Sequence, residues 1–468
     1  MAVHFVFIVA VVQGSFQIMV FAAAVAVAAL GAVVGCRRSR LAGHVDPFHP
    51  LLFPSIYVAV ACLAPPLWLS LSDIDLGYLE SSLIAPESPQ LMALAVLGFT
   101  LGAAIPFARR VALADDAIDP RLLERAGMVI ILVPLGFAAH NYLNKAVLTR
   151  GIGQDTVTLM DSISVVNVIL GLTAVILILV ARFQQGKSVL SVSEGSLVAA
   201  LVALSGLNGQ RHSALAILIA VLVFMTRRRG ASIRAVLGLS AILIFAYVVV
   251  LYRVTVILGP RPVPVTSAFV QDLGSVTFTT GITATLMSGG PYLDGATIFA
   301  GLIRQLPGPV ANSIFGPPVD TGAFQFRLRS GLTSDSTGYG FSLPAEGVIN
   351  FGTVGAFIVP FVAGVLIAWI YARFSPLGGR SINVLYAVVA STLPYGFRSD
   401  TLGAVKGVLY PGVLLGCAFA GAAAAQRARR RRPPAVRTAP GRYRSETGFA
   451  DRPGTSGAEV VTCAVSRR

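Results

Sequence analysis

The chain has 468 residues, of which 55% are hydrophobic and only 12% are charged, and its mean hydropathy is +0.77. Soluble domains carry about 25% charged residues, so this composition excludes a water-soluble globular fold. The formal net charge of +15 could suggest a nucleic-acid partner. We expect none, because the basic residues lie in breaks between apolar runs and in the tail, where they act as topology determinants near anionic lipid.

Apolar runs long enough to cross a membrane as helices recur along the whole chain, separated by polar or basic breaks. A span needs about 17 to 25 residues, since the hydrocarbon core is about 30 Å thick. The sequence therefore predicts an all-α integral membrane protein with about eleven transmembrane helices. We expect spans near 10–35, 51–72, 91–108, 127–146, 162–181, 188–207, 212–226, 235–258, 350–373, 382–397 and 402–425.

The positions of the basic residues predict how the chain is oriented. The first run lacks the positively charged leading region of a signal peptide, and its basic flank, Arg37 to Arg40, follows it. We therefore expect a retained span with its N-terminus outside a cytoplasmic membrane. Lys and Arg collect on the cytoplasmic side, and alternate breaks carry them: Arg109, Arg110, Arg121 and Arg125; Arg182 and Lys187; Arg227 to Arg229 and Arg234; Arg373 and Arg380. This parity predicts a cytoplasmic C-terminus.

One break in this pattern needs a choice between two interpretations. The stretch from Gly195 to Met225 could be one long helix or two helices joined at Asn208–His212. A single helix would put Arg182 and Arg227 on opposite sides of the membrane, against the charge rule, so we predict the helical hairpin.

Four regions follow from this topology. They are 1–258 with eight transmembrane helices, 259–343 as a large external loop, 344–425 with three transmembrane helices, and 426–468 as a disordered basic cytoplasmic tail. The four cysteines, Cys36, Cys62, Cys417 and Cys463, are scattered, so neither a disulfide nor a cysteine metal site is indicated.

The external segment 259–343 is long for a loop, and such loops are usually functional. The stretch Tyr292–Gln305 is amphipathic and predicts a helix along the outer interface. The Pro and Gly content that follows it favours an ordered irregular cap containing short helices rather than a strand domain.

The most distinctive string runs from Thr333 to Phe357, where a polar, glycine-rich stretch leads into an apolar span. Glu346 and Asn350 lie at the entrance of that span. A carboxylate there can simply favour the helix N-terminus, and this remains one interpretation of Glu346.

This string resembles bacterial oligosaccharide repeat-unit polymerases of the Wzy type, in which a Gly-aromatic loop leads to Glu and then Asn-Phe-Gly. The residues that carry the resemblance are Gly338, Tyr339, Gly340, Phe341, Glu346, Asn350, Phe351 and Gly352. Looser matches in the same order are Asp46-Pro47, Tyr292–Pro307, and Arg398 with Asp400. The chain departs from the pattern at Gly308, where Pro307 is not followed by Arg.

The resemblance implies transfer of a growing glycan from one polyprenyl pyrophosphate to the next lipid-linked repeat unit, at the outer face of the membrane. It also implies membrane lipid, a flippase and a chain-length regulator as partners. The leaving pyrophosphate gains charge in the transition state, and arginine binds phosphate oxygens through a bidentate fork. We expect Arg211 and Arg398 to act with Glu346 in catalysis.

Further candidates for substrate binding are Arg304, Arg327, Arg329, Asp335, Asn350, Asp400 and His212. The three arginines of the external segment could equally be solvated, or paired with Asp320, Asp335 or Asp400. The acceptor hydroxyl needs a base or hydrogen-bond acceptor, for which Glu346 is best placed, with Asp335, Asp400 and His212 as alternatives. We expect neither a metal nor another cofactor, since arginine can stabilise the leaving group.

Two other classes of function remain open. An O-antigen ligase or other polyprenyl-carrier glycosyltransferase resembles this architecture, but such ligases typically rely on a histidine in the large external loop, and 259–343 contains none. A polysaccharide flippase or other transporter usually has internally repeated halves and charged or broken helices near the midplane, and the sequence has no evident internal repeat.

Overall fold

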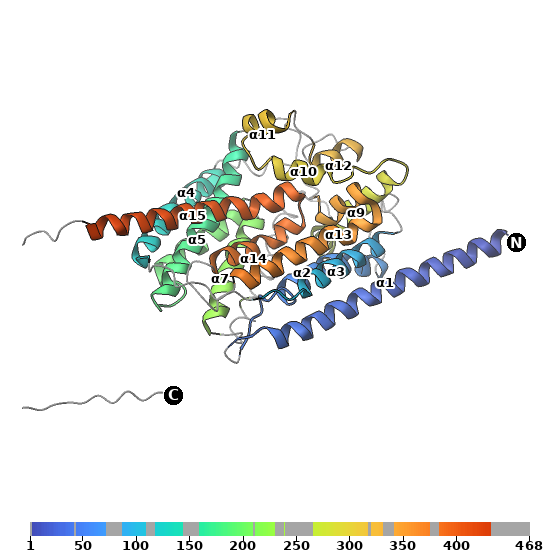
Figure 1. The fold of residues 1–468 in the computed structure, drawn as a ribbon, viewed down its shortest axis with the longest axis horizontal. Helices are drawn as coiled ribbons and strands as arrows, with labels where there is room; N and C mark the ends of the chain where they lie inside the picture. Colours follow the sequence, from blue (N-terminus) through green and yellow to red (C-terminus); the bar gives the residue numbers. More distant parts are fainter. Residues whose placement is uncertain are drawn as a thin grey trace, which may run out of the picture. The chain divides into compact units, whose positions relative to one another are not determined.

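The computed structural model describes residues 2–41, 44–71, 87–108, 118–143, 159–208, 211–229, 238, 265–316, 320–330, 341–374 and 383–431. Nearly all of these residues are helical (Figure 1). The helices are α1 (Ala2–Arg38), α2 (Phe53–Leu71), α3 (Ser88–Ala104), α4 (Pro120–Leu143), α5 (Leu159–Gln184), α6 (Val192–Leu207), α7 (Arg211–Arg229), α9 (Val265–Met287), α10 (Ala296–Ile303), α11 (Gly308–Phe315), α12 (Gly322–Ser330), α13 (Leu343–Phe374), α14 (Asn383–Phe397) and α15 (Thr401–Arg431). Strands β1 (Arg40–Leu41) and β2 (His44–Val45) form a two-residue antiparallel pair.

The apolar helices make this a membrane-associated protein. Within the described residues, four helical segments are long and apolar enough to cross a membrane: Ile18–Arg38, Pro120–His140, Leu343–Arg373 and Thr401–Ala428. Six shorter apolar helices of 10–17 residues lie in α2, α3, α5, α6, α7 and α14. The all-helical prediction is confirmed, whereas the count of about eleven spans and the orientation stay predictions.

Helices lie at the predicted span positions wherever the structure describes them. The predicted span 235–258 lies outside the described residues except for Gly238. The helical hairpin is present, because α6 ends at Leu207 and α7 begins at Arg211. One compact unit is Met1–Gln426 and the other is Arg427–Arg468, of which only the end of α15 is described. The division into four regions stays a prediction.

Close backbone packing joins α3 to α13 in the centre of the larger unit. A Cβ atom on Gly98 would collide with the Phe357 carbonyl oxygen, and one on Gly102 would collide with that of Phe361. From the other helix, Gly364 meets the Phe99 carbonyl in the same way. Small residues four apart let membrane helices approach closely, where dispersion and weak polar contacts replace the hydrophobic effect. Phe99 and its neighbours are fully buried in this contact.

The segment expected to be wholly external begins with a long helix, α9, that packs against α2, α3 and α13. A Cβ on Gly274 of α9 would lie 3.4 Å from the Pro65 ring of α2. The hydroxyls of Thr279 and Thr280 each lie 3.2 Å from the Ser342 hydroxyl just before α13. Its 23 residues are rich in Ser and Thr. The shorter helices α10, α11 and α12 lie together along one edge of the bundle (Figure 1), and α10 and α12 contact α13. We call residues 292–330 the cap.

The helix α13 is broken at Gly352, where φ is 65° and ψ is −150°. Gly347 and Gly355 lie so close that a Cβ on either would collide with the carbonyl oxygen of the other. In a straight helix these residues would be about 12 Å apart along the axis, so 343–351 folds back against the following segment. The 22 residues 353–374 then extend about 33 Å, enough to cross the hydrocarbon core.

The end of α13 farthest from Glu346 is held by polar contacts with the segment before α2. The Tyr371 hydroxyl donates to Asp46 Oδ2 at 3.0 Å, and Asp46 Oδ1 accepts from the Phe48 N–H at 3.0 Å. The Tyr386 hydroxyl of α14 also donates to the Phe48 carbonyl. The Asp46-Pro47 element therefore lies at the opposite end of α13 from Glu346, where it fixes the turn before α2.

Candidate functional site

Glu346 lies in the first turn of α13 and is completely buried. Its Oε2 atom accepts hydrogen bonds from the Thr401 N–H and the Thr401 hydroxyl, both at 2.7 Å. Its Oε1 atom accepts from the Thr297 hydroxyl at 3.2 Å. The carboxylate therefore joins three parts of the chain: the cap, the start of α13 and the start of α15.

Asn350 lies one turn further along α13 and is also completely buried. Its Nδ2 atom donates to the Thr297 hydroxyl and to the Glu346 carbonyl, both at 2.7 Å, and its Oδ1 atom accepts from the Thr297 N–H at 3.4 Å. Because the Asn350 amide offers both a donor and an acceptor, it binds both the N–H and the hydroxyl group of Thr297. Neither Asp nor Leu could replace it there.

Asp400 lies in the turn between α14 and α15, immediately before the first residue of α15. Its Oδ1 atom accepts from the Gly403 N–H at 3.0 Å, the arrangement of an N-cap, and its Oδ2 atom accepts from the Ala323 N–H in α12 at 3.2 Å. A second carboxylate thus ties the cap to the α14–α15 turn. We call Thr297, Glu346, Asn350, Asp400 and Thr401 the polar node.

The break at Gly352 explains why Asn-Phe-Gly follows the glutamate. Ending the first helical segment there leaves the carbonyls of Ile349 and Asn350 without helical donors, and the N–H groups of Leu293 and Asp294 bond to them at 3.1 Å each. A Cβ on Gly352 would lie 2.8 Å from the Tyr292 ring, and its positive φ also disfavours other residues. The motif is therefore a docking point for the cap.

The basic candidates of the hairpin and the last turn lie at neighbouring helix ends. The His212 ring, in the first turn of α7, stacks on the Tyr395 ring near the end of α14, with centroids 4.8 Å apart and planes at 27°. Arg211 precedes His212, and Arg398 follows α14 by one residue. Only the backbone position of Arg211 is described. The structure thus brings these two helix ends together.

The arginines of the cap have partners of their own. Arg304 lies 4.0 Å from Asp320, and Arg329 donates to Gln325 at 3.4 Å and to the Met287 sulfur at 3.1 Å. Arg327 is exposed on α12 and has further contacts. Asp335 lies outside the described residues, as do Gly338, Tyr339 and Gly340. In the described part of the chain, the partners of Arg304 and Arg329 lie outside the polar node.

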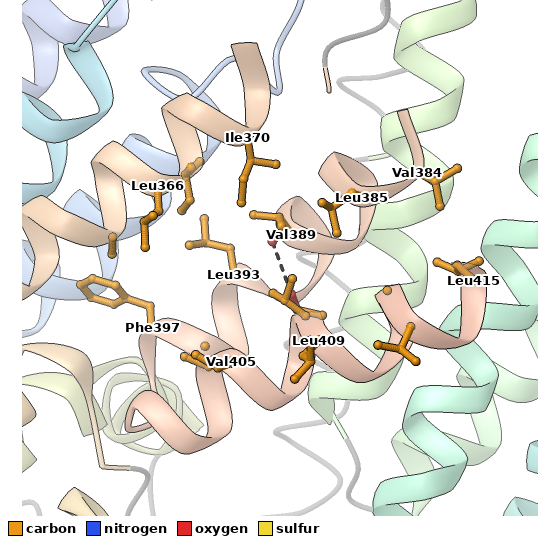
Figure 2. A pocket seen from close by; sticks show the side chains of 18 of the residues that line it. Leu366, Ile370, Val384, Leu385, Val389, Leu393, Phe397, Val405, Leu409 and Leu415 are labelled. Atoms are coloured by element: carbon orange, nitrogen blue, oxygen red, sulfur yellow. Dashed lines mark hydrogen bonds between the residues drawn. The ribbon is translucent and has the colours of Figure 1, made fainter. Parts of the chain in front are cut away.

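An apolar groove of about 820 Å³ runs between α13, α14 and α15. Figure 2 shows Leu366 and Ile370 of α13, Leu393 of α14, and Val405 and Leu409 of α15 pointing into it. Among the lining residues in the described part of the chain, only Thr392 has a polar side chain. Along α15 the groove extends from Ala404 to Phe419, about 22 Å, and one end reaches Leu343 and Phe397, beside the polar node.

The electrostatics of the node follow from its partners. The carboxylate oxygens of Glu346 and Asp400 are bound by neutral hydroxyl and backbone donors, and no cation in the described ranges lies within salt-bridge distance of either. Within those ranges no group of three or more His, Cys, Asp or Glu could hold a metal. The node can therefore orient backbone and hydroxyl groups, and its own carboxylates face protein.

Three contributors to the site were missed by sequence analysis. Thr297 and Thr401 carry no signal, because a hydroxyl residue beside a membrane helix is common. Lys406 did have one, since it is a charge within the apolar run 402–425. It lines a small cavity with His212 and Tyr395.

Comparison with known proteins adds no assignment: no family model, no curated protein and no solved structure matches this chain. Its function is therefore argued from its sequence string and from the geometry of these groups.

Proposed function

We propose that this protein is a polyprenyl-pyrophosphate-dependent glycosyltransferase that polymerises lipid-linked oligosaccharide repeat units. The observation that carries the proposal is the convergence of three separate elements of the resemblance. Thr297 from Tyr292–Pro307, Glu346 and Asn350 from the late-span string, and Asp400 from the last turn meet in one buried polar node. Elements so far apart in sequence have a shared role in one site.

The reaction breaks the bond between the sugar anomeric carbon and the pyrophosphate oxygen, and forms a bond to a hydroxyl of the incoming repeat unit. Polyprenyl pyrophosphate leaves, and the hydroxyl proton passes to a base. In this proposal Arg398 and Arg211 stabilise the charge of the leaving pyrophosphate, because the guanidinium group stays charged and binds two oxygens at once.

For Glu346 we propose a positioning role rather than direct contact with the sugar. It is fully buried, and both oxygens accept hydrogen bonds from protein groups. By holding Thr401 it fixes the α14–α15 turn from which Arg398 extends. Asp335, near the glycine-rich stretch, then takes the role of proton acceptor in place of Glu346.

The apolar groove supports a substrate with a long isoprenoid chain. It has one polar lining side chain, and its volume of about 820 Å³ falls in the range of about 300–1,000 Å³ that ligand pockets have. Its end at Leu343 and Phe397 adjoins the segments that carry Glu346 and Arg398. We propose that the tail of a lipid-linked substrate lies there with its pyrophosphate at the α14–α15 turn.

In this proposal the protein lies in the cytoplasmic membrane with its N-terminus outside and its tail inside. The polar node and cap are then at the outer face, where flipped lipid-linked repeat units arrive. The alternation of basic breaks supports this orientation.

The test is incubation of the purified protein with a single lipid-linked repeat unit in neutral-lipid nanodiscs. A polymerase makes a ladder of products from that one substrate. An O-antigen ligase instead needs a separate acceptor glycolipid, and a transporter leaves the repeat unit unchanged, so either of those results would overturn the proposal in favour of the named alternative.

A further inference from the structure

The helix α15 carries a lysine within its apolar run. Lys406 lies in Thr401–Ala428, one of the segments apolar enough to cross a membrane. It is five residues beyond Thr401, which places it about 7–8 Å along the helix axis. A charged side chain at membrane depth is costly, and those that occur usually face the bundle interior and mark a functional site.

Lys406 lines a small cavity between α5, α7, α14 and α15 and does not line the apolar groove. Gly403, Gly407 and Pro411 lie on the same side of α15 and line this cavity too, whereas Val405 and Leu409 line the groove on the other side. The remaining walls come from α5, α7 and α14, including the stacked rings of His212 and Tyr395. The ammonium group therefore borders a different cavity from the groove, although Thr392 lines both.

The ammonium group has no anionic partner in the described part of the chain. Its recorded contact is the Tyr410 ring, with Nζ 5.6 Å from the centroid. Such a contact contributes about 0.5–2 kcal/mol, but it neutralises no charge and leaves the three N–H donors of the ammonium without oxygen acceptors. The nearby carboxylate of Asp400 is already bound by the N–H groups of Gly403 and Ala323.

Two further basic residues lie close in sequence to residues that line this cavity. Arg211 is adjacent in sequence to His212, and Arg398 is three residues beyond Tyr395; both His212 and Tyr395 line the cavity. An ammonium group without an anionic partner at membrane depth carries a desolvation cost, and an anion bound beside Lys406 would offset it. The cavity therefore offers the Lys406 ammonium group to an anion.

The size of the cavity selects among anions. Its volume is about 60 Å³, and a water-sized group needs about 10–15 Å³ of such space. It therefore holds about four to six non-hydrogen atoms, which matches one phosphate group and excludes a sugar ring.

We propose that this cavity binds a phosphate group of a membrane lipid, with Lys406 in direct contact with the phosphate oxygens. Polymerisation consumes two lipid-linked molecules, and α15 separates this cavity from the groove proposed for the first. The cavity then holds the phosphate of the second. That naming of the lipid rests on the proposed function, whereas the anion site does not.

The test uses the full-length protein in phosphatidylcholine nanodiscs with polyprenyl monophosphate as the probe. The chain has three lysines, Lys145, Lys187 and Lys406, so acylation by an amine reagent can be read at each by mass spectrometry. We expect the probe to protect Lys406 and to leave Lys187 reactive. Lys406→Met should weaken probe binding at least about tenfold, the effect of losing a charge-assisted hydrogen bond, while Lys406→Arg retains most of it.

Lys187→Met is the matched control, because Lys187 is exposed just beyond α5. The Lys187→Met protein should bind the probe with the affinity of wild type. Unchanged affinity in Lys406→Met together with no protection of Lys406 would overturn the site. A further outcome is that inorganic pyrophosphate or phosphatidylglycerol protects Lys406 at the same concentration as polyprenyl monophosphate does. That result would support the anion site and overturn the lipid-linked substrate as its ligand. Intact protection without any polymerisation would instead overturn the proposed function alone.

Discussion

At the scale of single residues, the burial of Glu346 decides between two roles for a carboxylate in the same motif. A general base must reach the proton that it removes, whereas within the described part of the chain the Glu346 carboxylate hydrogen-bonds to Thr297 and Thr401. Its effect on catalysis would therefore pass through the α14–α15 turn. A mutation far from the reaction centre that displaces a catalytic group by about 1 Å can lower the rate about 10²-fold.

Replacing Glu346 with Gln should lower kcat about 10²-fold while KM changes little. The amide places a donor against the Thr401 donors, so one buried hydrogen bond is lost, at a cost of about 1–3 kcal/mol in the free energy of unfolding. Thr401→Val should give the same phenotype, and the double variant should show less than the sum of the two effects. Kinetics with thermal unfolding of the purified variants measures this.

Glu87→Gln serves as the control, because Glu87 is an exposed carboxylate before α3 whose side chain makes no capping hydrogen bond. Its kinetics should equal those of wild type. If Glu346→Gln polymerises at the wild-type rate, or if it abolishes only the pH dependence expected of a general base, the positioning role is wrong.

Gly352 offers a second test at the same scale. Gly352→Ala should destabilise the protein by about 1–3 kcal/mol, because alanine at this positive φ is strained and its Cβ would also lie against Tyr292. Loss of cap docking should appear as faster proteolysis within 292–330. The control is Gly136→Ala in α4, where nothing lies within 4 Å of the new Cβ. Equal protease resistance of Gly352→Ala and wild type would contradict the docking role.

At the scale of elements, the pairing of α3 with α13 fixes the span on which the polar node is mounted. Gly98→Val or Gly102→Val forces the helices apart, because the added atoms would overlap the carbonyls of Phe357 and Phe361. Overpacking of this kind costs about 1–3 kcal/mol, so we expect a lower melting temperature in detergent. In Gly421→Val on α15 the added atoms meet open space, so this variant should keep the melting temperature of wild type. A Gly98→Val protein as stable as wild type would refute this close packing.

The same scale shows why some elements could be predicted from sequence and others could not. Long apolar runs such as α15 are visible because nearly every residue in them is apolar. The helix α9 was hidden by its hydroxyl residues, although these are buried: Thr279, Thr280 and Thr283 each donate to the carbonyl four residues earlier. Self-satisfied hydroxyls cost little in an apolar setting, so a polar composition concealed a packed helix.

At the scale of the whole molecule, the sequence predicted the helical class and the helical hairpin, because apolar periodicity and basic breaks determine them. It named Glu346, Asn350 and Asp400 without indicating that they meet. Their convergence depends on the fold-back at Gly352 and on a cap whose path is set by backbone hydrogen bonds to Ile349 and Asn350. Such contacts join residues about 50 positions apart, and local patterns contain no record of them.

The orientation is also a whole-molecule prediction. In a background without native cysteines, Ser313→Cys on the exposed side of α11 should react with a membrane-impermeant thiol reagent in intact cells. Ser445→Cys in the tail should react only after permeabilisation. We expect this pattern because the alternation of basic breaks predicts a cytoplasmic tail. The reverse labelling pattern would contradict the orientation and the outer-face location of the polar node.

The measurement that tests the central claim most directly is the ratio of polyprenyl pyrophosphate released to glycosidic bonds formed by purified protein. Only the lipid-linked repeat unit and neutral lipid should be present. The account predicts a product ladder, one carrier released per bond, and at least about a 10²-fold loss of both in Glu346→Gln. Release of the carrier without polymer would contradict the account. So would the absence of any reaction from wild-type protein whose cap is shown to be folded by its resistance to protease.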